Sequence, residues 1–123
     1  MKEGWIKLKR ATTKLRARRI IPITDNLKAW IGDSAKTTGK VQDYSSAQTM
    51  SAAIAAAIGG TGVPMKRNAL RNCYTSYRLG VLGDTAKVAK ETGNSPQVIR
   101  EEYLELVTPE QGREWFSIFP RLK

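Results

Sequence analysis

The sequence contains no histidine, and this absence narrows the chemistry that its side chains can perform. Histidine is the only residue whose unperturbed side chain changes charge near neutral pH, and it is the commonest metal ligand. Cysteine occurs once, at Cys73. The sequence therefore excludes His-dependent catalysis, metal sites rich in His or Cys, and an internal disulfide. We expect no metal and no other cofactor, and proton transfer that relies on Lys, Tyr, Asp or Glu.

Long apolar segments are scarce as well. A helix that crosses a bilayer needs roughly 20 apolar residues, whereas the longest apolar run here covers only residues 52–58 and consists mostly of alanine. The first residues lack the apolar segment of a secretory signal peptide. Together with the single cysteine, these features predict a cytoplasmic protein without a membrane partner.

Acidic residues are outnumbered by basic ones. The 123 residues include 21 Lys and Arg but only 11 Asp and Glu, which gives a net charge of +10. Such an excess on a small domain indicates a polyanionic partner, because contacts with phosphates release condensed counterions. A basic surface that merely keeps the protein in solution is the alternative, and binding through charge alone predicts steep salt dependence without sequence preference. The densest basic group lies near the N-terminus, at Lys2, Lys7, Lys9, Arg10, Lys14, Arg16, Arg18 and Arg19.

The pattern of apolar residues predicts one domain, residues 1–123, that is mainly α-helical with a small N-terminal β-hairpin (α+β). Apolar residues alternate in 5–9 and β-branched residues gather in 18–23, so we place the hairpin at 4–24 without an evident third strand. The helical part covers residues 25–119. Capping residues, glycines and prolines delimit helices at about 24–31, 46–58, 66–82, 84–92, 95–106 and 109–116.

Residues 84–103 combine two short helices with a tight turn. Asp84 is expected to cap the first helix, Gly93 to end it, and Ser95-Pro96 to begin the second. This arrangement resembles a helix-turn-helix, which would place Pro96, Gln97 and Arg100 in a major groove of DNA. An ordinary pair of packed helices is the alternative.

Three segments resemble the tyrosine recombinases of the phage-integrase family. The run Asn68-Ala69-Leu70-Arg71 is similar to the His-x-x-Arg box, and the run 92–96 (Thr-Gly-Asn-Ser-Pro) is similar to the family's Leu-Gly-His-Ser segment. Tyr103 follows Asn94 at the spacing of the nucleophile, nine residues further on. Residues 13–23 resemble the family's β-hairpin, in which a lysine precedes a basic and apolar run that ends in proline. Together the three segments cover roughly residues 4–106.

The resemblance implies the C-terminal part of an integrase catalytic domain, which breaks and rejoins DNA through a 3′-phosphotyrosyl intermediate in the full protein. It implies Tyr103 as nucleophile, Arg71 as phosphate ligand and Lys14 as general acid, with Asn68 and Asn94 at two further catalytic positions. The implied partner is double-stranded DNA, with self-association on the DNA. We assign DNA contacts to Arg16, Arg18, Arg67 and Arg78. The rings of Trp115, Phe116 and Phe119 would dock on a neighbouring copy or pack in the core.

The sequence also departs from the family pattern. The family's first catalytic arginine precedes the hairpin, on a segment that this sequence does not contain. Asparagine replaces histidine at Asn68 and Asn94, and it cannot transfer a proton. Glu101 and Glu102 directly precede Tyr103. We therefore expect weak or no recombinase activity from this chain alone, as an excised piece of an integrase or the product of a degenerate gene. The alternative function is a non-enzymatic helix-turn-helix DNA-binding protein.

Overall fold

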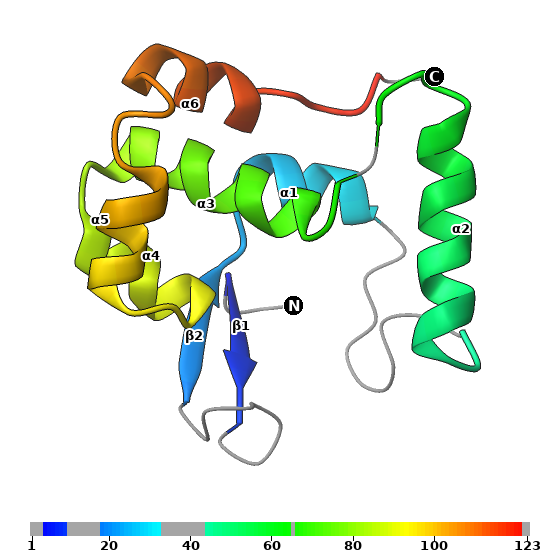
Figure 1. Ribbon diagram of the computed structural model, residues 1–123, viewed down its shortest axis with the longest axis horizontal. Helices are drawn as coiled ribbons and strands as arrows, with labels where there is room; N and C mark the ends of the chain where they lie inside the picture. Colours follow the sequence, from blue (N-terminus) through cyan, green and yellow to red (C-terminus); the bar gives the residue numbers. More distant parts are fainter. Residues whose placement is uncertain (1–3, 10–17, 33–43, 65, 122–123) are drawn as a thin grey trace.

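The computed structural model describes residues 4–9, 18–32, 44–64 and 66–121. This part of the chain is mainly helical, with six helices and one two-stranded antiparallel sheet, as the α+β prediction expects (Figure 1). None of these helices is long and apolar enough to cross a membrane. The elements are β1 (Trp5–Leu8), β2 (Arg19–Pro22), α1 (Asp25–Ile31), α2 (Ala47–Gly59), α3 (Ala69–Leu82), α4 (Thr85–Thr92), α5 (Pro96–Tyr103) and α6 (Pro109–Phe116).

The two strands form the hairpin that the alternation of apolar residues predicts. Ile6 is paired with Ile21 and Trp5 with Pro22. The backbone N–H of Ile23 donates to the Gly4 oxygen at 2.8 Å, which extends the pairing beyond the strands. Figure 1 shows the hairpin below α1 and α3, and β2 is in contact with α4. The hairpin is therefore supported by α4 and does not depend on a third strand.

Local capping residues set the boundaries of α4 and α5, as predicted. The Asp84 carboxylate accepts hydrogen bonds from the first backbone N–H groups of α4. Gly93 ends this helix in the left-handed conformation, with φ of 75°. The Ser95 hydroxyl then accepts a hydrogen bond from the N–H of Val98, with Pro96 in the first turn of α5. Side-chain oxygens satisfy helix-end N–H groups that would otherwise have no partner.

Two helix boundaries differ from the prediction. Helix α3 begins at Ala69, later than the expected 66, because Asn68 adopts a left-handed conformation with φ of 58°. Helix α5 ends at Tyr103, earlier than the expected 106, because Leu104 has an extended backbone and Glu105 a φ of 63°. Both changes place a predicted catalytic residue, Asn68 or Tyr103, at the end of a helix.

The core lies where α3, α4 and α5 meet. Its buried apolar residues are Leu79, Val88, Ala89 and Ile99, and the side chain of Tyr103 packs against them. This core is small, so the positions of the three helices depend on close contact among them. It also fixes the ring of Tyr103 relative to α3 and α4.

Helix α6 packs closely along α3, above it in Figure 1. The rings of Tyr77 and Trp115 are stacked with their centroids 5.2 Å apart, and Tyr74 meets Phe116 edge to face. Trp115 and Phe116 thus pack within the chain, which was one of their two expected roles, whereas Phe119 is 49% exposed.

A glycine permits this close approach, and its replacement is expected to destabilise the protein. A β-carbon on Gly112 would lie 2.9 Å from both the Tyr77 carbonyl oxygen and Val81 Cγ2. Gly112→Ala should therefore lower the free energy of unfolding by about 1–3 kcal/mol, measured by urea denaturation. Gly59→Ala is the matched control, because a β-carbon at this helical glycine has no neighbour within 4 Å. Equal stability of the two variants would contradict the close-packing argument.

Candidate functional site

Arg71 lies in the first turn of α3 and reaches across to the end of α4. Its Nη2 donates to the carbonyl oxygen of Thr92 at 3.0 Å and also to Oδ1 of Asn94. Asn94 follows directly after the glycine that ends α4, so the turn between α4 and α5 presents it to Arg71. Arg71 and Asn94 come from two separate segments of the predicted site, and the fold brings them into direct contact.

Tyr103 is the last residue of α5, and its hydroxyl points to the same end of α3. The hydroxyl donates a hydrogen bond to Oδ1 of Asn72 at 2.9 Å, and Asn72 is the neighbour of Arg71 in the chain. The ring of Tyr103 packs on the core while its hydroxyl is held by a residue exposed to solvent. The contact of Arg71 with Asn94 and that of Asn72 with Tyr103 therefore lie at adjacent, exposed residues near the N-terminus of α3.

Arg19 joins this cluster from the hairpin, although its sequence position did not mark it as a site residue. Its Nη1 donates to the Thr92 carbonyl oxygen at 2.7 Å. A β-carbon at Gly93 would overlap the Arg19 guanidinium. Gly93 is thus favoured by its left-handed conformation, and a side chain at this position would displace the Arg19 guanidinium. The only sequence signal for Arg19 was its membership of a basic run, which many other residues share.

The remaining predicted residues are distributed as follows. Asn68 precedes α3 at the same helix end, is exposed, and makes no side-chain capping hydrogen bond. Arg67 and Arg18 are exposed. Lys14 and Arg16 lie outside the described residues, so the roles of general acid and DNA contact for them stay predictions.

Arg78 has a different environment from Arg71. Its guanidinium forms a two-pronged ion pair with Glu91, with Nε 2.9 Å from Oε2 and Nη2 3.0 Å from Oε1. The Tyr74 hydroxyl donates to the same carboxylate at 2.8 Å. The side chains of Arg78 and Glu91 are only 14% and 11% exposed. Glu91 therefore balances the charge of Arg78, whose contact with DNA stays a prediction.

The contacts among Tyr74, Arg78 and Glu91 raise the pKa of Tyr74 and of Arg78. Burial, reinforced by the hydrogen bond to Glu91, raises the pKa of Tyr74 well above its ordinary value. The hydrogen bond to Glu91 also raises the pKa of Arg78. Tyr74 thus stays neutral and Arg78 stays charged in the folded protein, which holds α3 against α4 next to the site.

The Tyr74 shift predicts a loss of stability in alkali. Folding raises the pKa of Tyr74, so the neutral Tyr74 hydroxyl stabilises the folded state. This stabilisation is complete below the tyrosine pKa of the unfolded chain, about 10, and is lost as the pH rises through the pKa of Tyr74 in the folded protein. The free energy of unfolding should therefore fall above about pH 10, and fall less steeply in Tyr74→Phe. Denaturant titrations between pH 8 and 11 in roughly half-unit steps measure this slope. Tyr44→Phe, at an exposed tyrosine, should retain the wild-type slope; identical slopes in all three proteins would refute the prediction.

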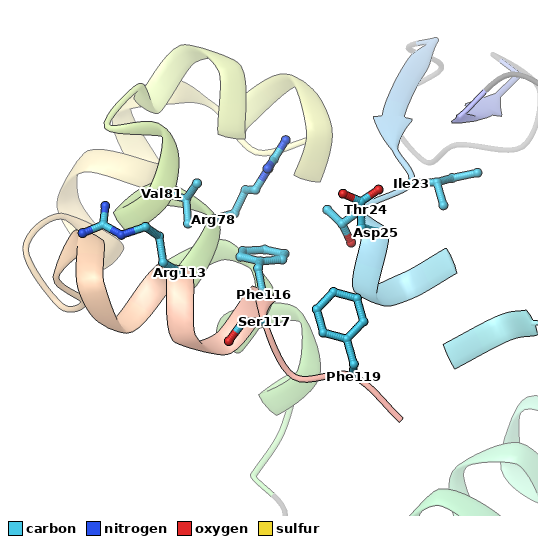
Figure 2. A pocket seen from close by; sticks show the side chains of 9 residues that line it. All are labelled: Ile23, Thr24, Asp25, Arg78, Val81, Arg113, Phe116, Ser117 and Phe119. Carbon is cyan, nitrogen blue, oxygen red and sulfur yellow. The ribbon is translucent and has the colours of Figure 1, made fainter. Parts of the chain in front are cut away.

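A pocket of about 460 Å³ lies on another part of the molecule, between the start of α1 and the α3–α6 pair (Figure 2). Figure 2 shows the rings of Phe116 and Phe119 facing Thr24 and Asp25 across it. The catalytic candidates in the described part of the chain, Asn68, Arg71, Asn94 and Tyr103, do not line this pocket. Its described lining consists of Ile23, Thr24, Asp25, Arg78, Val81, Arg113, Phe116, Ser117 and Phe119. The cluster around Arg71 is therefore a separate site on the surface.

Comparison with known proteins adds no relative. No family model, no curated protein and no solved structure matches the chain. Within the described residues, no three His, Cys, Asp or Glu side chains are grouped so that they would hold a metal ion. Any function must therefore be inferred from the contacts of Arg19, Arg71, Asn94 and Tyr103 themselves.

Proposed function

We propose that this chain is a DNA-binding part of a site-specific tyrosine recombinase, in which Tyr103 is the nucleophile and Arg71 binds the scissile phosphate. One observation carries the proposal. Arg71 in the first turn of α3 donates to Asn94 in the turn after α4. The next residue of α3, Asn72, accepts a hydrogen bond from the hydroxyl of Tyr103 at the end of α5. These contacts support the proposal because they hold Arg71 and Tyr103, two residues that the resemblance names, at neighbouring positions of one helix end.

The chemistry suits the residues that are present. The Tyr103 oxygen attacks the phosphorus of a DNA phosphodiester, the bond from phosphorus to the 5′ oxygen breaks, and the tyrosyl proton passes to solvent. Arg71 donates to the non-bridging oxygens, where negative charge increases in the transition state. By resemblance, Lys14 gives a proton to the leaving 5′ oxygen. The hydrogen bond from Tyr103 to Asn72 orients the hydroxyl before the reaction.

The helix-turn-helix alternative makes use of α4 and α5 in a different way. It needs the exposed face of α5 to enter a groove of DNA. That face carries Glu101 and Glu102, both exposed, and Gln97 donates its side-chain N–H to Glu101 at 2.7 Å. Two carboxylates on this face repel phosphates, which counts against insertion of α5 into a groove. The same carboxylates precede Tyr103 and agree with the weak activity expected of a recombinase. The alternative predicts that DNA binding is lost in Arg100→Ala and unchanged in Tyr103→Phe.

A covalent-trapping experiment tests the proposal. The protein is incubated with a pool of nicked duplexes of randomised sequence, in which cleavage releases a short fragment and prevents religation. Because the activity expected of this chain alone is weak, we expect wild type to accumulate slowly a protein–DNA adduct that survives denaturing electrophoresis. The adduct should be absent with Tyr103→Phe, since only the hydroxyl is removed. Tyr44→Phe should form the adduct at the wild-type level, because Tyr44 is an exposed tyrosine outside the cluster. An adduct in Tyr103→Phe, or none in wild type that binds the same DNA, would reject the proposal.

A further inference from the structure

Two guanidinium groups share one backbone oxygen in this structure. Arg19 Nη1 lies 2.7 Å and Arg71 Nη2 lies 3.0 Å from the carbonyl oxygen of Thr92. A carbonyl oxygen has two lone pairs, so it accepts both hydrogen bonds. The two nitrogens are therefore no farther apart than the sum of these distances, although they belong to β2 and α3, which are far apart in the sequence.

Among the residues that the structure describes, no carboxylate balances the charge of this pair. In the described residues, Arg78 is paired with Glu91 and Arg113 with Glu110, whereas neither Arg19 nor Arg71 forms an ion pair. Their shared acceptor is neutral, so the two positive charges repel each other and attract an anion. Most N–H donors of both groups also have no acceptor in the described part of the chain.

We propose that Arg19 and Arg71 together bind one phosphate group, each through a different non-bridging oxygen, so that Arg19 supplies a second arginine to the site. Planar guanidinium groups are well suited to phosphate oxygens. Asn94 accepts from Arg71 through Oδ1, which leaves its side-chain N–H groups available to the same anion. The assignment of this phosphate to DNA rests on the proposed function; the binding of phosphate itself does not.

A purely structural role gives a different expectation. Thr92 is the last residue of α4, and basic side chains stabilise helix C-terminal carbonyls. If Arg19 only caps this helix, its loss lowers stability and leaves phosphate affinity unchanged. Stability and phosphate affinity must therefore be measured on the same variants.

The experiment titrates inorganic phosphate into the ¹⁵N-labelled full chain at constant ionic strength, balanced with chloride. In wild type we expect saturable shifts of the Arg19 and Arg71 Nε–H signals and of the backbone amides at 92–94. Arg19→Ala should weaken binding about tenfold, because one set of charge-assisted hydrogen bonds is lost. Arg19→Lys should weaken it less, since lysine keeps the charge but not the planar fork. Lys90→Ala, which removes one exposed positive charge from α4, should bind as wild type.

The outcomes separate this inference from the proposed function. Unchanged phosphate affinity in Arg19→Ala and Arg19→Lys, or no shift at 92–94 in wild type, overturns the two-arginine site. If the amide spectrum shows that Arg19→Ala does not fold, the Arg19→Lys affinity decides. Phosphate binding that depends on Arg19 without a covalent DNA adduct would support this site while rejecting the recombinase. An adduct together with Arg19-independent phosphate binding would reject this site alone.

Discussion

Glu91→Ala is expected to lower the free energy of unfolding by about 3 kcal/mol, a large part of the stability of a small domain. Glu91 is the only carboxylate that contacts Arg78 and Tyr74 in the described residues, and its side chain is 11% exposed. Its removal leaves a nearly buried guanidinium and a hydroxyl without their acceptor, which costs more than the loss of an exposed contact. Urea denaturation monitored by circular dichroism measures the change.

Glu110→Ala is the matched control for this prediction. Glu110 also pairs with an arginine, Arg113, at 2.6 Å, but the two side chains are 71% and 62% exposed. Solvent screens such a pair, so its removal should cost much less than removal of Glu91. If both variants lost the same stability, burial of the Arg78–Glu91 pair would not be what stabilises the contact between α3 and α4. Arg78→Ala combined with Glu91→Ala should recover part of the loss, because no buried charge is then left unpaired.

Arg71 and Arg78 show why sequence alone could not assign roles to the basic residues. They are seven residues apart, so they project from a similar side of α3. Arg78 contacts Glu91, which balances its charge, whereas the acceptors of Arg71 in the described part of the chain are a carbonyl and an amide oxygen. Their partners belong to α4 and the turn after it, and the register between two packed helices is set by core side chains rather than by local sequence.

The helix boundaries were predictable because the residues that set them act locally. A capping carboxylate such as Asp84, or a glycine such as Gly93, acts within one turn of the residue that carries it, so its effect is visible in the sequence. The contacts of Arg19 with Thr92 and of Tyr103 with Asn72 join residues 73 and 31 positions apart. No spacing rule predicts such pairs. The resemblance named Arg71, Asn94 and Tyr103 as site residues, but it gave no indication of Arg19 or Asn72.

Arg71→Ala is expected to slow formation of the covalent DNA adduct by about 10²–10³-fold at saturating DNA, the usual cost of losing one group that stabilises transition-state charge. Stability should change little, because Arg71 is exposed and outside the core. Arg71→Lys should recover only part of the rate, since lysine binds as a point charge and cannot reach Thr92, Asn94 and a phosphate with one planar group. Time courses of adduct formation on the nicked duplexes give these rates.

Arg113→Ala separates this effect from a general loss of positive charge. Arg113 is exposed on α6 and distant in sequence from the cluster, and its replacement removes the same unit of charge as Arg71→Ala. It should lower DNA affinity slightly at low salt and leave the rate at saturating DNA at the wild-type value. Equal slowing in the two variants would mean that charge alone drives the reaction, and Arg71 would then lose its assigned role. A slow Arg71→Ala that regains activity with added guanidinium would instead place the missing group at the phosphate, because the small cation can occupy the position that the side chain has left.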